Sequence, residues 1–421
     1  MTLFAVEGAA GCGKTFRLME ALGEALGATP LQEGQRVMAL TFMHGARRRL
    51  NEKLRSVPGL AGRFECVTID SFAWRLLRRW RGLAAALGVQ PPREDQYDAQ
   101  CDAAGVLLER PEVRGWTAAS FPIVLVDEAQ DLKPQRLRIL CALAQSVQTL
   151  IAADEFQCLD AALRPNPLIG WMRGACEPEV LNRVRRTNVP ALLTAATAIR
   201  GGAAPVAGAG FRILAAQGVP VAAAMLASAI RWRKGGRVAV ITPSLQGGFA
   251  NSVVRRVCES PCGAQRNGPY AIRWERSEQD ETAAMIDGLQ LNGVVSTAEA
   301  LAALEALPRS GAIREANIWV RHQARARGRS EFTRADIEAV IARQVAVRRQ
   351  RYGSDNYDFT AMTVQQAKNR EFDGVFILWP YQIGGDAEHK RRLLYNALTR
   401  AQRWCTVVAQ NADLLQAAPF Q

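Results

Sequence analysis

The chain has 421 residues, 48% of them hydrophobic, which suits about two to four domains with apolar cores and excludes a disordered chain. Lys and Arg number 53 against 40 for Asp and Glu, and the charge of +13 favours a polyanionic partner, most simply nucleic acid. Arg makes up 47 of the 53 basic residues, a bias that a GC-rich genome explains equally well.

A glycine-rich stretch lies near the N-terminus. Residues 8–15 read GAAGCGKT and fit the phosphate-binding pattern G-x-x-x-x-G-K-[ST], between an expected strand at 3–6 and an expected helix at 17–26. The backbone N–H groups of such a loop bind phosphates, Lys14 would reach the β- and γ-phosphates, and the Thr15 hydroxyl would hold Mg²⁺. The predicted nucleotide-binding residues here are Gly8, Ala9, Ala10, Gly11, Cys12, Gly13, Lys14, Thr15, Phe16 and Arg17.

Strands alternate with helices along the first half. The expected strands are 36–42, 64–69, 122–126 and 149–153. The run PIVLV at 122–126 is continuously apolar, as in a central parallel strand, and Asp127 and Glu128 follow it at once. Asp127 would hold Mg²⁺ and Glu128 would act as general base, whereas acidic capping of the next helix is the structural alternative. The pattern predicts a doubly wound α/β sheet.

A second unit of the same type is expected downstream. Its expected strands are 236–242, 360–364, 374–379 and 405–409. Residues 286–354 read as mostly helical and basic, and the arginines between 321 and 334 form either a solvated helix surface or contacts to a nucleic-acid backbone. Residues 213–230 carry no charge, but Gln217, Gly218 and Pro220 interrupt them, so we expect a loop and a buried helix, not a membrane span.

The cysteines predict no metal site. Nine are scattered along the chain, and the one close pair, Cys258 and Cys262, has too few neighbouring ligands. We therefore expect free thiols in a reducing environment, and no signal-like segment before the first strand. Together these features favour a cytoplasmic protein.

Further motifs resemble those of superfamily 1 helicases of the UvrD/Rep/PcrA type. VDEAQD at 126–131 follows a strand, downstream of the phosphate loop, as in that family. Segments 39–42 and 67–72 resemble motifs that touch single-stranded DNA, and 154–157 (DEFQ) resembles the motif whose Gln senses the γ-phosphate. The remaining motifs are 181–187, similar to Leu-x-x-Asn-Tyr-Arg-Ser; 363–372, similar to Thr-x-His-x-x-Lys-Gly-x-Glu-Phe; and 391–403, similar to the last family motif.

The resemblance implies two RecA-like α/β domains with ATP and Mg²⁺ between them. The first would supply Lys14, Thr15, Asp127, Glu128 and Gln157. The second would supply Arg186 and Arg400, two cations that reach the γ-phosphate when the cleft closes. Arg185 falls where the family has an adenine-stacking aromatic residue, and Glu371 falls where a carboxylate binds the ribose.

The same resemblance implies contacts to single-stranded DNA. They are Thr41, Phe42, Thr68, Asp70, Ser71, Phe72, Trp171, Thr363 and Gln365. Burial in the core is the alternative for the aromatic residues. Asp70 and Gln365 stand where the family usually has His, and Asn369 stands where it has Gly. The chain starts at the first strand, so we expect the family's adenine-reading Gln segment to be absent.

The expected domain plan is compact. Residues 1–180 form the first RecA-like domain, with a short insertion at about 82–120; residues 181–285 and 355–421 form the second; and 286–354 form a reduced helical insertion. Larger family members engage duplex DNA with bigger insertions in these places. A compact member would therefore translocate well and unwind poorly alone.

Three functions follow. The first is an ATP-driven translocase and helicase on single-stranded or partly duplex DNA, moving 3′ to 5′ as the resemblance implies. The second is a DNA-stimulated ATPase that senses nucleic acid and regulates a protein partner, such as a nuclease in repair or defence. The third is a binding module without hydrolysis, which the intact Lys14, Asp127, Glu128, Gln157 and Arg400 oppose.

Overall fold

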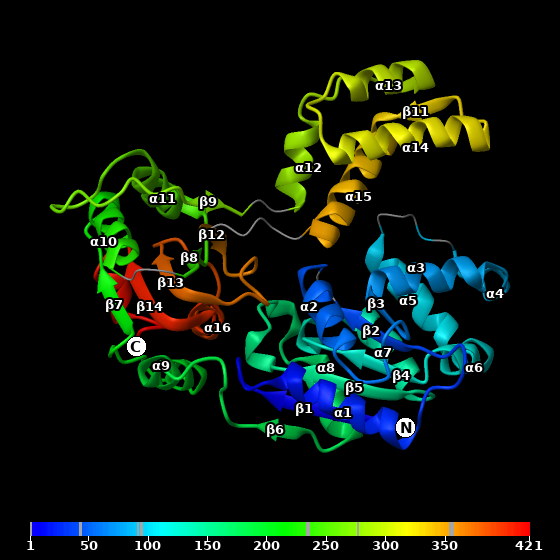
Figure 1. Ribbon diagram of the computed structural model, residues 1–421, viewed down its shortest axis with the longest axis horizontal. Coiled ribbons are helices and arrows are strands. Elements are labelled where there is room, and N and C mark those ends of the chain that lie inside the picture. Colours follow the sequence, from blue (N-terminus) through cyan, green and yellow to red (C-terminus); the bar gives the residue numbers. More distant parts are fainter. Residues whose placement is uncertain are drawn as a thin grey trace. The chain divides into compact units, whose positions relative to one another are not determined.

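The structure is a computed structural model that describes residues 2–41, 44–90, 92, 96–232, 236–275, 278–352 and 358–421 (Figure 1). It divides into two compact units, which we describe separately. The large unit combines Met1–Ile272 with Thr363–Gln421, and the small unit is Arg273–Met362. The sequence predicts an insertion over 286–354, within the small unit.

The first sheet of the large unit has six parallel strands in the order β3-β2-β4-β5-β1-β6. The strands are β1 (Leu3–Gly8), β2 (Val37–Thr41), β3 (Phe64–Thr68), β4 (Ile123–Val126), β5 (Gln148–Ala153) and β6 (Glu179–Leu181). The helices are α1 (Lys14–Ala28), α2 (His44–Arg55), α3 (Ile69–Arg79), α4 (Arg81–Ala86), α5 (Tyr97–Leu108), α6 (Pro111–Ser120), α7 (Pro134–Ala144) and α8 (Pro167–Ala175).

Both faces of this sheet are covered by helices. Alternate residues of β4 pack into different cores: Val124 and Val126 into one, Ile123 and Leu125 into the other. Burial on both faces explains why the strand reads as a continuous apolar run. The doubly wound α/β sheet predicted from the sequence is therefore confirmed.

The second sheet has the order β7-β14-β13-β8-β12-β9. Its strands are β7 (Phe211–Ala215), β8 (Val238–Thr242), β9 (Arg273–Trp274), β12 (Phe359–Thr363), β13 (Phe372–Trp379) and β14 (Ala401–Ala409). The helices of this half are α9 (Pro190–Arg200), α10 (Val219–Trp232), α11 (Phe249–Glu259) and α16 (Ala387–Leu398). The pairings of β13 with β8 and β14, and of β14 with β7, are parallel, as predicted.

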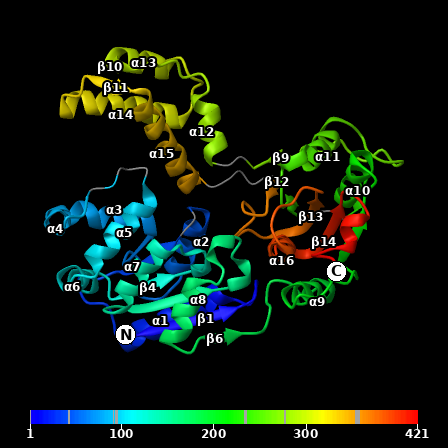
Figure 2. The same ribbon diagram turned by 180° about the vertical axis from the view of Figure 1, so that it is seen from behind.

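The small unit is helical with one two-stranded sheet (Figure 2). Its elements are α12 (Glu278–Ile286), β10 (Val294–Ser296), α13 (Thr297–Glu305), α14 (Gly311–Arg327), β11 (Glu331–Thr333) and α15 (Arg334–Tyr352). The strands β10 and β11 are antiparallel, and Phe332 lies in a core with Leu304, Val320 and Ile337. The unit carries 13 Arg, no Lys and 13 Asp plus Glu, so the whole charge of +13 belongs to the large unit.

Three of the five arginines between residues 321 and 334 are paired with acids. Arg321 contacts Glu305 at 3.3 Å, Arg329 contacts Asp336 at 2.5 Å, and Arg334 contacts Glu338 at 2.6 Å. Exposed pairs of this kind contribute little to stability, but they offset the positive charge that a polyanion would meet. This pairing favours a solvated helix surface over contacts to nucleic acid.

The sequence reading missed five short strands, β6, β7, β9, β10 and β11. We expected a loop before the helix in residues 213–230, but the edge strand β7 ends there at Ala215. β7 lies at an edge of the second sheet, where only one side of the strand is paired. The helix α10 lies where the buried helix was expected.

Candidate nucleotide site in the large unit

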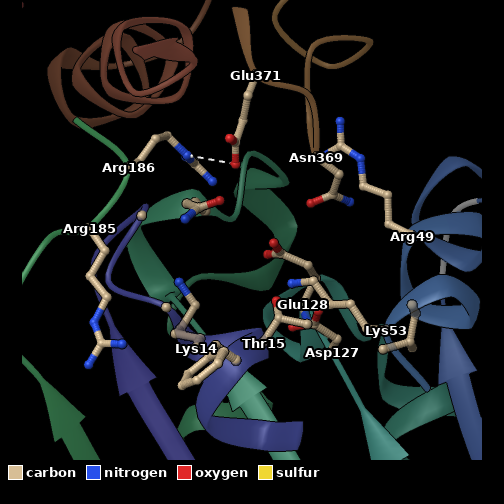
Figure 3. A pocket seen from close by; sticks show the side chains of 15 residues that line it. Lys14, Thr15, Arg49, Lys53, Asp127, Glu128, Arg185, Arg186, Asn369 and Glu371 are labelled. Carbon is tan, nitrogen blue, oxygen red and sulfur yellow. Dashed lines mark hydrogen bonds and ion pairs between the residues drawn. The ribbon is translucent and has the colours of Figure 1, made fainter. Parts of the chain in front are cut away.

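A cavity of about 270 Å³ lies at the carboxyl ends of the strands of the first sheet (Figure 3). The first half of the chain lines it with Gly11, Gly13, Lys14, Thr15, Phe16, Arg49, Leu50, Lys53, Asp127, Glu128 and Gln157. The later part contributes Arg185, Arg186, Asn369 and Glu371. The cavity therefore brings together residues from both sheets of the large unit.

The phosphate loop has the backbone that its glycines permit. Gly11 and Gly13 have φ of 81° and 88°, in the left-handed region that favours glycine. A Cβ on Gly11 would lie 2.7 Å from the Cβ of Arg186, so a side chain there would collide with the segment before α9. Gly13 is the residue before α1, which places the helix N-terminus at the cavity.

Lys14 is folded back onto its own loop. Its Nζ donates to the carbonyl oxygens of Gly8 at 2.9 Å and Ala9 at 3.3 Å. The side chain is 7% exposed, so these carbonyls satisfy an ammonium that has little contact with water. In this state the two carbonyl oxygens accept the hydrogen bonds that Lys14 would donate to phosphate oxygens when a nucleotide binds.

Thr15 and Asp127 form the pair of oxygen donors predicted for magnesium. The Thr15 hydroxyl donates to Oδ2 of Asp127 at 2.8 Å. Burial, and then the neighbouring Glu128, raise the pKa of the Asp127 carboxyl to about 6, while Thr15 and Lys14 oppose the rise. Hard oxygen ligands from one hydroxyl and one carboxylate suit Mg²⁺, which keeps several waters and binds phosphates as well.

Glu128 has a strained backbone. Its φ is 56°, which is uncommon for a residue with a side chain. The Nε2 of Gln130 donates to Oε2 of Glu128 at 2.7 Å, and the Oε1 of Gln130 accepts from the backbone N–H of Asp154 at 3.0 Å. Gln130 therefore orients the carboxylate and ties it to the end of β5. The sequence reading missed this role, although Gln130 lies inside the VDEAQD motif.

Gln157 connects the two sheets. Its Nε2 donates to Asp154 at 2.9 Å, and its Oε1 accepts from Nη2 of Arg400 at 3.2 Å. Arg400 is 2% exposed, and burial followed by repulsion from Arg186 lowers the pKa of its guanidinium to about 10. Arg400 does not line the cavity itself but lies behind Gln157.

Arg186 lines the cavity and is held by Glu371. Its Nε donates to Oε1 of Glu371 at 2.9 Å, and its Nη1 donates to the carbonyl of Thr399 at 2.9 Å (Figure 3). Burial raises the pKa of Glu371, but Arg186 and Gln402 outweigh this effect and lower it. Glu371 thus contacts an arginine here, at the place where the resemblance implies a ribose.

Phe16 and Arg185 face each other at one end of the cavity. The Arg185 guanidinium lies 5.6 Å from the centre of the Phe16 ring, which is 53% exposed. An aromatic face and a guanidinium plane are two surfaces on which a base can stack. At the other end, Asn369 has φ of 61°, a conformation that Asn tolerates and that explains why the related motif has Gly.

Two basic residues of α2 were missed by the sequence reading. Arg49 and Lys53 line the cavity on the side away from Arg185 (Figure 3). They are four residues apart and therefore share one face of the helix. Their spacing within the basic run of residues 47–55 was visible, but only the fold shows that this face meets the cavity.

One predicted nucleotide ligand has other partners in this structure. Arg17 donates through Nε to both oxygens of Glu179, at 3.0 and 2.9 Å, and through Nη1 to Glu24 at 2.9 Å. It does not line the cavity. Arg17 instead connects α1 to the edge strand β6. Cys12 is 3% exposed and packed inside the loop, so it offers only its backbone to a ligand.

The predicted DNA contacts of the first half are largely structural. Phe72 is 2% exposed and belongs to the core under the first sheet, so base stacking on it is wrong for this conformation. Asp70 accepts from Nη2 of Arg136 at 2.6 Å, and Arg136 also binds Asp98 of α5 at 2.6 Å. The ion pair offsets the charge of Asp70 and fixes the insertion to α3. Asp70 therefore has a structural partner in place of the proposed contact.

The remaining candidates differ in exposure. Thr41 is 1% exposed, and Thr68 caps α3, its hydroxyl accepting from the backbone N–H of Ser71 at 3.1 Å. Trp171 is half-buried against the core, Thr363 is half-buried and bonds Gln366, and Gln365 is exposed. Phe42 lies outside the described residues. Of the described candidates, Ser71 and Gln365 are therefore the two on an open surface.

Two family models match the chain. Residues 1–162 match an AAA domain, and residues 358–408 match the UvrD-like helicase C-terminal domain. Residues 358–408 thus resemble the UvrD-like helicases, and the two six-stranded sheets fit the two RecA-like domains expected from the sequence.

Comparisons with whole proteins are more distant. No curated protein sequence matches the chain. Arterivirus nonstructural protein 10, a helicase, is 11% identical with a TM-score of 0.40, over 99% of this chain and 61% of that one. Its complex with DNA is 12% identical with a TM-score of 0.39, over 99% and 62%. The chain thus spans about 61% of the length of that helicase. Among the described residues, no helix has the length and apolar character that crossing a bilayer requires.

Proposed function

We propose that the chain hydrolyses ATP in the cavity of the large unit and couples hydrolysis to movement along single-stranded DNA, 3′ to 5′. The observation that carries the proposal is that Arg186 lines the same cavity as Lys14, Asp127 and Glu128. A guanidinium from a second domain stabilises charge on the transferred phosphoryl group only when the two domains are together. Hydrolysis then changes the contacts between the domains, which is what a motor requires.

Each cavity residue has a role that its chemistry allows. Lys14 leaves the carbonyls of Gly8 and Ala9 to bind the β- and γ-phosphates. Thr15 and Asp127 hold Mg²⁺, which neutralises phosphate charge when bound. Glu128, oriented by Gln130, accepts a proton from the attacking water. Gln157 contacts the γ-phosphate, and its hydrogen bond to Arg400 couples the presence of that phosphate to the position of the second sheet.

The base is held by stacking between Phe16 and Arg185. Neither side chain reads the edge of a base, so the slot discriminates weakly between purines. The site therefore accepts both ATP and GTP, with the preference set elsewhere. A nucleotidase assay with ATP and GTP, each with and without single-stranded DNA, tests the proposal. Stimulation by DNA supports it, and a rate equal to the uncatalysed one would end it.

A second function is favoured by one observation, the charge balance of the small unit. Its 13 basic and 13 acidic residues give it no net attraction for the duplex ahead of a motor. This favours an ATPase that senses DNA and regulates a partner such as a nuclease, with little unwinding of its own. A strand-displacement assay separates the two: unwinding by the isolated chain supports the helicase, and DNA-stimulated turnover without unwinding supports the sensor.

A further inference from the structure

A buried carboxylate lies beside the phosphate loop. Asp154 directly follows β5, and its side chain is 0% exposed. Its Oδ2 accepts from Nε2 of Gln157 at 2.9 Å, and its Oδ1 accepts from the backbone N–H of Phe156 at 3.2 Å. A buried carboxylate also needs a cation nearby to remain charged without a large cost. Two cations compete for this role, Lys14 and Arg200.

Arg200 makes the short contact. Its Nη1 lies 2.6 Å from Oδ1 of Asp154, whereas the Nζ of Lys14 lies 3.9 Å from Oδ2. Arg200 is the last residue of α9, in the second half of the large unit. None of the helicase motifs recognised in the sequence includes it. The arginine therefore acts on the phosphate loop from outside those motifs.

Arg200 is held in place by a second set of contacts. Its Nη1 donates to the hydroxyl of Tyr395 at 3.3 Å, and its guanidinium lies over the rings of Phe156 and Tyr395 at 5.7 and 5.8 Å. The same Tyr395 hydroxyl accepts the backbone N–H of Ala10 at 2.8 Å. Arg200 thus contacts a side chain that binds the phosphate loop, as well as the carboxylate beside it.

The distances indicate which of the two cations, Lys14 or Arg200, remains available to bind a ligand. An ion pair in a buried place strongly reduces the charge that either partner presents to a third group. Because Arg200 occupies Asp154 directly, Lys14 stays 3.9 Å away and is held only by two carbonyls. Phosphate oxygens can displace neutral carbonyl oxygens from Lys14 far more readily than they could displace a charged carboxylate such as Asp154.

We propose that Arg200 is a positioning residue that neutralises Asp154 and so keeps Lys14 available to the phosphates of the nucleotide. The inference rests on the proposed function, because it assumes that the cavity binds a nucleoside triphosphate. Without Arg200, Lys14 moves onto Asp154 and nucleotide binding weakens. Catalysis in the bound state changes little, because Arg200 touches no reacting atom.

The test measures ATP binding and turnover in the full chain. We expect Arg200→Ala to raise the Kd for a fluorescent ATP analogue and the KM for ATP by about tenfold or more, with kcat within about twofold of wild type. Arg200→Lys restores most of the affinity. In a chain that already carries Asp154→Asn, Arg200→Ala should cause no further loss of affinity, because the anion that competes for Lys14 has been removed.

Two control variants isolate the role of Arg200. Arg164→Ala removes an arginine that contacts Asp386 at 3.3 Å and does not touch the phosphate loop; a similar loss of affinity there would mean that loosened domain contacts cause the effect, and would overturn the inference. Lys14→Ala tests the nucleotide site itself. If Lys14→Ala binds the analogue like wild type, the proposed function fails. If Lys14→Ala loses binding but Arg200→Ala retains it, only the role of Arg200 is overturned.

Discussion

Arg400 and Gln157 join the two sheets of the large unit through one buried hydrogen bond, from Nη2 to Oε1 at 3.2 Å. The two side chains come from the last motif and from the end of β5, and both residues are under 5% exposed. A displacement of Gln157 would therefore act directly on Arg400, which lies between α16 and β14. This contact leads to the first prediction.

Replacing Arg400 by Ala should lower kcat by roughly 10³-fold or more while binding of single-stranded DNA persists. The reason is that its guanidinium, which lies behind Gln157 in this state, is expected to reach the transferred phosphoryl group when the cleft closes. The measurement is steady-state ATP turnover with DNA present. Arg403→Ala is the matched control, since Arg403 lies three residues further along the chain, on β14, with its side chain 72% exposed. An unchanged rate in Arg400→Ala would show that the second sheet does not complete the site.

The second prediction concerns the general base. Glu128→Gln should abolish turnover and retain nucleotide, because the amide keeps the shape of the side chain but accepts no proton. Lys14→Ala should abolish both turnover and binding. Glu24→Gln, on the exposed face of α1, serves as the control in the same turnover and binding assays. Turnover near wild type in Glu128→Gln would remove the proposed base.

The third prediction concerns the base slot. Phe16→Ala should raise the KM for ATP and for GTP alike by about tenfold, with kcat little changed, since stacking contributes about 1–3 kcal/mol and does not read base edges. Tyr381→Ala removes an aromatic residue of similar exposure, 67%, outside the cavity and should leave both KM values unchanged. A loss confined to one nucleotide would contradict stacking as the mode of binding.

The fourth prediction separates core from DNA contact. Phe72→Ala should lower the free energy of unfolding by about 3–5 kcal/mol because it leaves a cavity in the core. At a temperature where the variant is folded, its affinity for single-stranded DNA should equal that of wild type. Denaturant titration and fluorescence anisotropy with a labelled oligonucleotide measure the two quantities. Weaker DNA binding by the folded variant would restore Phe72 to the interface.

The fifth prediction concerns an ion pair between the halves of the large unit. Lys368 donates to both oxygens of Asp131 at 2.8 Å. Burial raises the pKa of Asp131, and Lys368 opposes this rise. Lys368→Ala removes that opposition, so the folded-state pKa rises further and the ionised carboxylate costs about 2 kcal/mol or more.

The sign of the pH dependence follows from that shift. In Lys368→Ala the loss of stability should be largest near neutral pH, where Asp131 must ionise, and should shrink as the pH falls through the raised folded-state pKa. Urea titrations at several pH values measure this trend. Adding Asp131→Asn should recover most of the stability at neutral pH, and a loss that does not vary with pH would contradict the assignment.

The sequence predicted most of the fold because its signals are local. A continuous apolar run such as 122–126 is typical of a strand covered on both faces, and the structure places β4 there between two cores. The edge strands β6 and β7 were missed because one side of each is unpaired and their residues are only partly buried. Short edge strands therefore lack the pattern that identifies central ones.

Some residues of the candidate site could likewise be predicted from the sequence, and others could not. Lys14 and Thr15 follow β1, and Asp127 and Glu128 follow β4. They lie close together because both strands are parallel members of one sheet, with β5 between them, and their carboxyl ends meet at the same edge. Arg49, Gln130 and Arg200 could not be assigned, because their roles depend on which helix faces which loop. Asp70 and Phe72 were assigned from their motif, but the contacts to Arg136 and to the core come from elements distant in the chain.

The balanced charge of the small unit has an evolutionary consequence. Because residues 273–362 add no net charge, their loss or replacement would leave the electrostatic attraction of the chain for a polyanion as it was. Selection acting on that attraction is confined to the other residues. The segment between β9 and β12 can therefore diverge, shorten or acquire new contacts without changing the electrostatic attraction of the other residues for a polyanion.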